Sequence, residues 1–262
     1  MLSTAEEWAD IAEVNPPALP NARHLMLDHA WQRVLITDNA FGKIRVSPYA
    51  FAARITHDVP SVVPTVVVST RDRNILAIES EVRGALGNGV ESFLVVVGDT
   101  RPQVEHMAHH YEIVEHLREL QNHLPRFEAG MTTRFRKWQY RRRVEAGGEF
   151  FVTGPILDPA TVAPSFEKLA RDPADPPVYL MVIPPFSLGW VERMESVGSV
   201  PVSEALRTEV TEAMPRERAW ELALQVADEA KEVGAAGVIV TGLKFNTVVD
   251  EAVGIWKRGG LS

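Results

Sequence analysis

Carboxylate side chains lie within or just after the first four strand-like runs of the sequence, where they could act as acids, bases or partners for a developing positive charge. They are Glu13 in the run 11–15, Asp38 after 33–37, Asp72 after 65–70 and Asp99 after 92–97. A loop carboxylate often only caps the next helix, which is enough to explain Asp72. Glu13 differs, because a carboxylate inside a strand is costly unless it faces solvent or is held at a site. The residue pattern alone leaves both interpretations open.

Short apolar or β-branched runs alternate with stretches of helical spacing along the chain. The predicted strands are residues 11–15, 33–37, 65–70, 92–97, 126–128, 149–153, 178–183 and 237–241, and the predicted helices are residues 23–32, 48–55, 74–88, 111–123, 133–145, 160–170 and 216–233. Runs that are apolar at every position are typical of parallel strands, and this alternation predicts a (β/α)8 TIM barrel. No linker-like stretch divides residues 1–262, so we expect a single domain, with an extra helix at 198–214 before the last β/α unit. The strand ends of such a barrel meet at one mouth, which would bring the carboxylates together.

The composition is that of a globular protein and excludes several kinds of chemistry. With 262 residues, 45% of them hydrophobic and 24% charged, the chain can bury a sizeable core. The absence of cysteine excludes thiol nucleophiles, disulfides and Cys-ligated metals. A formal charge of -8 argues against general nucleic-acid binding, and no apolar run approaches the roughly 18 residues of a membrane span. We therefore expect a cytoplasmic protein with neither a nucleic-acid nor a membrane partner.

Two clusters of basic side chains have ordinary explanations. Residues 134–143 hold six arginine or lysine side chains, which is typical of a solvated helix face or of a phosphate site. Nucleic-acid binding is a much weaker third interpretation, because the chain as a whole is acidic. Five histidines lie between residues 106 and 123, and His106 and His110 are one helical turn apart, as two metal ligands could be. No third ligand is assigned, so surface histidines are the favoured interpretation and no metal is expected.

Four short motifs follow one another at or near the predicted strand ends. They are Glu-Val-Asn-Pro-Pro at 13–17, Ile-Thr-Asp-Asn-Ala at 36–40, Val-Gly-Asp at 97–99, and Arg-Arg-Arg-Val-Glu-Ala-Gly-Gly at 141–148, which leads into Phe-Val-Thr at 151–153. In this order they resemble methylenetetrahydrofolate reductases, and the resemblance spans most of the predicted barrel. It implies a flavin-containing TIM barrel of one-carbon metabolism and methionine biosynthesis. Such an enzyme reduces 5,10-methylenetetrahydrofolate to 5-methyltetrahydrofolate, passing a hydride from NAD(P)H to FAD and then to the one-carbon unit.

The resemblance also implies roles for individual residues. Glu13 matches the general acid that helps to open the imidazolidine ring to an iminium, and Asp99 matches the aspartate that stabilises this cation and binds the pterin. The implied cofactor contacts are Thr37 and Gly98 at the flavin ring, and Arg141 and Arg143 at the flavin phosphates. Thr153, in the sixth predicted strand, is implied as a substrate contact.

Four positions depart from the pattern of the family. Val67 replaces a histidine of strand three, Val97 an arginine of strand four, residues 128–131 the loop after strand five, and Gly154 a glutamine of strand six. Because the first three supply contacts to FAD in the family, we predict that the purified protein carries little or no FAD, and direct hydride transfer from NAD(P)H stays open. The alternative function is a non-catalytic or partner-dependent folate-binding subunit. The sequence also leaves a homo-oligomer open.

Overall fold

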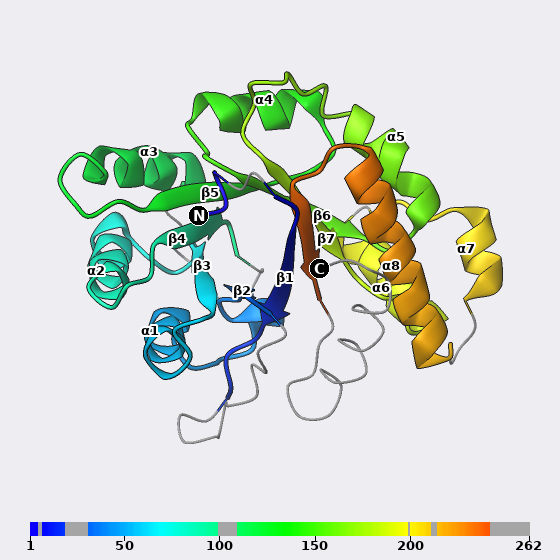
Figure 1. Cartoon of the computed structure of the whole chain (residues 1–262), viewed down its shortest axis with the longest axis horizontal. Coiled ribbons are helices and arrows are strands. Elements are labelled where there is room, and N and C mark those ends of the chain that lie inside the picture. The colour runs from blue at the N-terminus through cyan, green and yellow to red at the C-terminus, as the bar shows by residue number, and fades with distance from the viewer. Residues whose placement is uncertain (5–6, 19–30, 99–108, 199, 211–213, 242–262) are drawn as a thin grey trace.

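The computed structural model describes residues 1–4, 7–18, 31–98, 109–198, 200–210 and 214–241. Parallel strands close into a barrel in chain order, with the helices around the outside (Figure 1). The strands are β1 (Ala9–Val14), β2 (Arg33–Ile36), β3 (Val63–Ser69), β4 (Ser92–Val96), β5 (Glu128–Thr133), β6 (Phe151–Ile156), β7 (Val178–Val182) and β8 (Gly237–Val240). The helices are α1 (Pro48–Asp58), α2 (Ile75–Leu86), α3 (His110–Leu120), α4 (Lys137–Glu145), α5 (Val162–Glu167), α6 (Leu188–Gly198), α7 (Glu204–Glu209) and α8 (Arg216–Glu232), with 3-10 turns η1 (Ala40–Gly42) and η2 (Pro159–Thr161). The predicted single-domain TIM barrel is confirmed.

Alternate residues of each strand face the barrel interior and the surrounding helices, so two separate cores form. Ile11 and Leu35 belong to the interior core, whereas Val14 belongs to the core between strands and helices. Because both faces are covered, the strands are apolar at nearly every position. By the same alternation Glu13 and Thr37 follow Ile11 and Leu35 on the inner face, toward the carboxyl end of the barrel.

The first residues of the chain close the amino end of the barrel. Leu2 is only 1% exposed and belongs to the interior core. The buried carboxylate of Glu128 accepts hydrogen bonds from the backbone N–H groups of Leu2 (2.6 Å) and Ser3 (2.7 Å) and from the hydroxyl of Ser92 (2.7 Å). The hydroxyl of Tyr179 donates to the carbonyl of Leu2 at 2.8 Å. The carboxyl end is therefore the mouth at which a ligand has access to the barrel.

The fifth strand lies later in the chain than the sequence predicts. Instead of residues 126–128 it covers Glu128–Thr133, and α4 begins at Lys137 rather than at residue 133. The cause is packing between neighbouring strands: a Cβ on Gly130 would lie 2.5 Å from the ring of Phe150. A residue without a side chain is needed there, so this strand lacks the β-branched pattern that marks the others.

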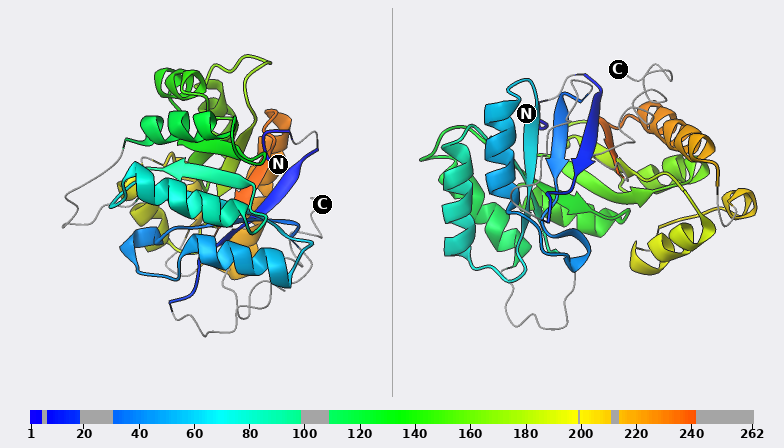
Figure 2. Two further views of the ribbon diagram at one scale, coloured as in Figure 1. Left: turned by 90° about the vertical axis from the view of Figure 1, so that its left-hand side faces the viewer. Right: turned by 90° about the horizontal axis from the view of Figure 1, so that it is seen from below.

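The extra helix that the sequence predicts between β7 and α8 is present as α7, which is shorter than the predicted range 198–214. A second helix, α6, precedes it (Figure 2). The hydroxyl of Ser203 accepts from the backbone N–H of Leu206 at 3.2 Å, so a side-chain cap fixes the start of α7. The predicted helix at 23–32 lies almost entirely outside the described residues. In the ranges that are described, no helix combines the length and apolar character that a membrane span requires.

Candidate active site at the carboxyl ends of the strands

Glu13 and Thr37 lie side by side on the first two strands, at the mouth of the barrel. Glu13 is half-buried and stands in register with Leu35. The hydroxyl of Thr37 donates to the side-chain oxygen of Asn15 at 2.8 Å, which ties the ends of β1 and β2 together. The structure thus places the predicted acid where a ligand in the mouth could reach it. Asp99, its predicted partner, lies outside the described residues.

Gly98 packs directly against the end of β3. Its φ of 85° is in the left-handed region, and an added Cβ would lie 2.1 Å from the hydroxyl oxygen of Ser69. The Nε of Arg71 donates to the carbonyl of Gly98 at 3.4 Å. Both the backbone conformation and the contact with Ser69 require glycine here, so its presence is explained without any approach to a planar ring.

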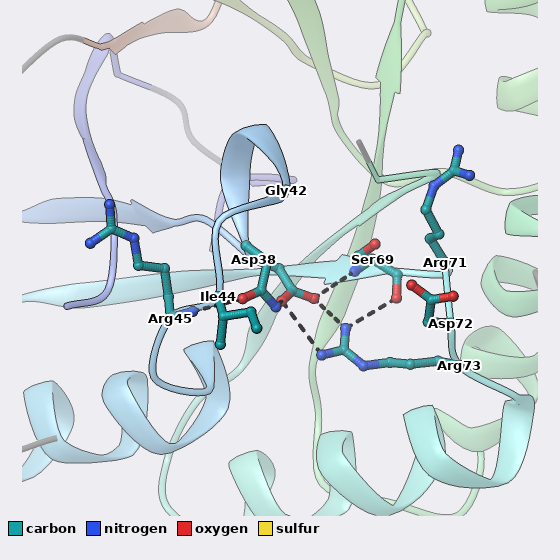
Figure 3. Close-up of a pocket in the computed structure, with 9 residues that line it drawn as sticks. Asp38, Gly42, Ile44, Arg45, Ser69, Arg71, Asp72 and Arg73 are labelled. Carbon is teal, nitrogen blue, oxygen red and sulfur yellow. Dashed lines mark hydrogen bonds and ion pairs between the residues drawn. The ribbon is translucent and has the colours of Figure 1, made fainter. Parts of the chain in front are cut away.

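A cavity of about 290 Å³ opens between the ends of β2 and β3 (Figure 3). It is lined by Asp38, Asn39, Gly42, Ile44, Arg45, Ser69, Arg71, Asp72 and Arg73. The side chain of Asp38 is fully buried in the wall of the cavity, where its carboxylate pairs with the guanidinium of Arg73 and accepts from the backbone N–H of Ser69 at 3.2 Å. Arg73 also donates to the carbonyl of Ser69 at 3.1 Å. The charge of Asp38 is therefore compensated within the protein.

A buried tyrosine and a glutamate support this ion pair from the helices behind it. The Nε of Arg73 lies 3.3 Å from a carboxylate oxygen of Glu81 on α2. Burial raises the pKa of Glu81, and the positive charge of Arg73 opposes that rise. Burial likewise raises the pKa of the Tyr49 phenol on α1. Asp38, Arg73 and Glu81 thus form one charged network in the wall of the cavity, and the guanidinium of Arg73 lies over the ring of Tyr49, 5.8 Å from its centroid.

The arginines of the cavity are absent from the site that the sequence predicts. The signal that points to two of them, Arg71 and Arg73, is the segment Ser-Thr-Arg-Asp-Arg at 69–73, directly after the third strand. Asn74 caps α2, because its side-chain oxygen accepts from the backbone N–H of Ala77 at 2.9 Å. The residue that caps α2 is therefore Asn74 rather than Asp72, and the pairing of Arg73 with Asp38 is brought about only by the fold.

Arg143 is buried between α3 and α4 with hydrogen-bonding capacity to spare. Arg143 is 6% exposed, and its Nε and Nη1 atoms have no hydrogen-bond partner among the described residues. Burial lowers the pKa of Arg143, and the Tyr111 side chain opposes this. Burial, with a further contribution from the positive charge of Arg143, lowers the pKa of His110 to about 4. An oxygen acceptor, from water or from a ligand, would satisfy these donors.

Two predicted contacts are used elsewhere in the structure. Arg141 makes ion pairs with Asp175 and, at 3.0 Å, with Asp172, in the loop before β7 at the amino end of the barrel. The hydroxyl of Thr153 donates to the carbonyl of Gly154 (2.8 Å) and accepts from the backbone N–H of Met181 (3.2 Å), bridging an irregularity between β6 and β7. Neither side chain joins Glu13 and Thr37 at the mouth.

The positions that depart from the family pattern offer few polar groups. Val67 is 8% exposed and packs in the interior core, so it supplies no hydrogen bond. Residues 128–131, expected in place of a loop, are part of β5. Of the residues that the structure describes, no three His, Asp or Glu side chains form a group that could hold a metal, and His106 is outside them. His116 instead lies 2.7 Å from a carboxylate oxygen of Glu79.

No protein-family model and no curated sequence matches the chain. Among solved structures it is similar to an F420-dependent secondary alcohol dehydrogenase in complex with an F420–acetone adduct, with a TM-score of 0.63 and 12% identity over 96% of this chain and 98% of that one. It is also similar to 2,3-dimethylmalate lyase, a PEP mutase/isocitrate lyase superfamily member, with a TM-score of 0.56 and 14% identity over 99% and 85% of the two chains. The carboxyl transferase domain of Rhizobium etli pyruvate carboxylase gives a TM-score of 0.55 and 11% identity over 92% and 41%. At these identities the similarity shows the barrel fold alone, and the resemblance to folate reductases stays a prediction.

Proposed function

We propose that the protein is a methylenetetrahydrofolate reductase-like oxidoreductase that uses NAD(P)H. The observation that carries the proposal is the position of Glu13, a half-buried carboxyl on the inner face of β1 at the open mouth of the barrel. A general acid must lie where the substrate can reach it, and a carboxyl at the open mouth meets that requirement. Thr37 on the neighbouring strand, bonded to Asn15, keeps the two strand ends together beside it.

In this proposal Glu13 donates a proton to a nitrogen of the imidazolidine ring. The bond between that nitrogen and the one-carbon unit breaks, and the electron pair of the other ring nitrogen forms an iminium. A hydride from NAD(P)H reduces the iminium carbon to a methyl group, so one proton and one hydride are consumed for each 5-methyltetrahydrofolate formed. Asp99 is the predicted source of negative charge for the cationic stage.

The described residues fit the phosphate of a nucleotide cofactor better than they fit a flavin ring. Arg143 presents buried donors without acceptors, which suits a phosphate oxyanion. Val67 on the inner face supplies no hydrogen bond to a ring system. A flavin, when bound, would relay the hydride between the nicotinamide and the one-carbon unit. The dehydrogenase of similar fold works with F420, which is a precedent for a redox cofactor on such a barrel.

The direct test is an assay for 5-methyltetrahydrofolate from methylenetetrahydrofolate with NADH or NADPH, with and without added FAD. We expect product with the wild type and a loss of about 100-fold or more in turnover for Glu13→Gln, because general acid catalysis contributes about that much. Folate binding, measured by fluorescence titration, should survive the substitution. Glu91→Gln, an exposed carboxylate before β4, is the matched control and should keep full turnover.

Two outcomes would count against the proposal. Absence of product under every condition would remove it, and folate binding without turnover would favour the binding-subunit alternative. An absorption spectrum of the purified protein tests the cofactor separately. A stoichiometric flavin spectrum would show that the prediction of little or no FAD is wrong.

A further inference from the structure

The turn between β5 and α4, together with the outer face of that helix, forms a basic surface beside the mouth of the barrel. It consists of four exposed cationic side chains and one exposed aromatic ring: Arg134, Arg136, Lys137, Arg142 and Trp138. No acidic residue lies between positions 134 and 144. Only residues 134–136 separate the end of β5 from the start of α4, so the first of these side chains stand at the carboxyl end of the barrel.

The four cations of the basic surface lack acidic partners. Within the described part of the chain, none of them makes an ion pair, and the guanidinium of Arg142 lies over the ring of Tyr111 instead. The chain has 35 acidic and 27 basic residues, so a shortage of carboxylates is not the reason. Exposed arginines on other helices do face carboxylates, as in the pairs Arg54 with Asp58, Arg83 with Glu79, and Arg207 with Glu195.

These positive charges also oppose the local structure that carries them. Lys137 is the first residue of α4, the first turn holds no acidic residue, and Arg136 at the N-cap makes no capping hydrogen bond through its side chain. The amino end of a helix is partially positive, so cations there are unfavourable. Burial lowers the pKa of Arg143, and the positive charge of Arg134 lowers it further. An anionic partner would relieve both repulsions.

Aromatic rings lie among the charges. The side chain of Trp138 is 61% exposed, although it is large and apolar. Arg142 follows it by one helical turn on the same face of α4, and its guanidinium carbon lies 4.6 Å from the ring centroid of Tyr111 on the neighbouring helix α3 (Figure 1). Tryptophan and arginine are the residues that most often dominate the binding energy of protein interfaces. The basic surface therefore has the composition of a docking site for a polypeptide.

Exposed carboxylates on the same two helices limit the extent of this surface. They are Glu112 and Glu115 on α3, and Glu145 at the end of α4. From Lys137 to Glu145 the helix rises by about 12 Å, at about 1.5 Å per residue. An extended peptide of about four residues covers that length, at about 3.3 Å per residue. A long polyanion such as a nucleic acid would meet the carboxylates and the overall charge of -8.

We propose that the basic surface docks a short acidic peptide segment of a partner protein. The carboxylates of the segment would pair with Arg134, Arg136 and Lys137, and an apolar side chain between them would cover the ring of Trp138. Because the surface stands at the rim of the mouth, the partner would lie beside the entrance to the candidate active site. The proposal does not depend on folate reduction.

The test is fluorescence anisotropy of a fluorescein-labelled peptide, Glu-Glu-Leu-Glu-Glu, titrated with the full chain at an ionic strength of about 0.15 M. We expect the peptide to bind, and the double variant Arg136→Glu with Lys137→Glu to weaken binding at least tenfold, because it sets like charges against each other. Trp138→Ala should weaken binding about tenfold. Arg126→Glu, at an exposed arginine just before β5 at the amino end of the barrel, is the matched control and should bind as wild type.

Failure to fold would not explain a loss of binding in the double variant. Acidic side chains suit the amino end of a helix, so this variant should resist urea at least as well as wild type. The proposal is overturned if wild type does not bind the acidic peptide, if the neutral peptide Gln-Gln-Leu-Gln-Gln binds equally well, or if the double variant binds as tightly as Arg126→Glu.

Two further measurements separate the proposed partner from other occupants of the surface. Tighter binding of a single-stranded oligonucleotide with the same charge as the peptide would assign the basic surface to nucleic acid. A salt-sensitive dimer of the wild type in sedimentation, lost in the double variant, would assign it to a second copy of this chain. Either result overturns the proposal. None of these readouts involves turnover, so failure of the folate hypothesis would leave them unaffected.

Discussion

At the scale of single residues, Arg143 is a buried charge whose partners are incomplete. We expect Arg143→Met to leave the free energy of unfolding unchanged or to raise it by about 1 kcal/mol, since an apolar side chain of similar length removes an unsatisfied charge. The same variant should lose affinity for a phosphate-bearing cofactor. Urea unfolding measures the first effect, with the exposed Arg136→Met as control. A destabilisation of more than about 2 kcal/mol would mean that the guanidinium is fully bonded in the folded protein.

His110, whose pKa is lowered by burial and by the neighbouring Arg143, makes the stability of the folded protein depend on pH. Its pKa is about 4 in the folded state against an ordinary value of 6.5, so the unfolded chain takes up a proton first as the pH falls. The stability contributed by neutral His110 is present above about pH 6.5 and is lost between pH 6.5 and 4. We expect a loss of the order of 1 kcal/mol, reduced from the full shift because the side chain keeps some access to water. Unfolding measured across this range should show a smaller slope for His110→Gln and an unaltered one for the exposed His123→Gln.

At the scale of elements, the pairing of β5 and β6 depends on a glycine facing an aromatic ring. Gly130→Ala would push a Cβ to 2.5 Å from Phe150, and we expect a destabilisation of about 2–3 kcal/mol from overpacking. Gly154→Ala in β6 is the control, because nothing lies within 4 Å of its added Cβ. A double variant with Phe150→Leu should recover part of the loss, which a double-mutant cycle detects. Strict additivity of the two changes would contradict the proposed clash.

At the scale of the whole molecule, Glu128 joins the start of the chain to the first residue of β5, at the amino end of the barrel. Glu128→Gln would set an amide N–H group against a backbone N–H donor, so we expect a loss of about 2–3 kcal/mol in the free energy of unfolding. Thermal or urea unfolding measures it, and the exposed Glu119→Gln on α3 should change it by less than about 0.5 kcal/mol. An equally small effect of Glu128→Gln would show that these buried hydrogen bonds contribute little to closing the barrel.

The strands of the barrel can be predicted from the sequence because the pattern that marks each strand is local. Seven of the predicted strands overlap closely with observed ones, since a strand covered on both faces must be apolar throughout. The sequence left open which face of its strand Glu13 occupies, and the interior core that contains Ile11 and Leu35 places it on the inner face. The bounds of the fifth strand are not predicted from the local pattern, because its residue types are determined by contacts with residues elsewhere in the chain. Gly130 is shaped by Phe150, and Glu128 by the backbone of Leu2, 126 residues away in the chain.

The destinations of long side chains are decided only by the tertiary structure. Arg141 and Arg143 look equivalent in the sequence, yet two residues along a helix turn the side chain by about 200°. Arg143 is consequently buried near His110, whereas Arg141 reaches the acidic loop before β7. Asp38 and Arg73 are 35 residues apart and meet because β2 and β3 are neighbours in the closed sheet. Local pattern specifies which residues form a strand, but charge pairing depends on which strand ends the closed barrel places together.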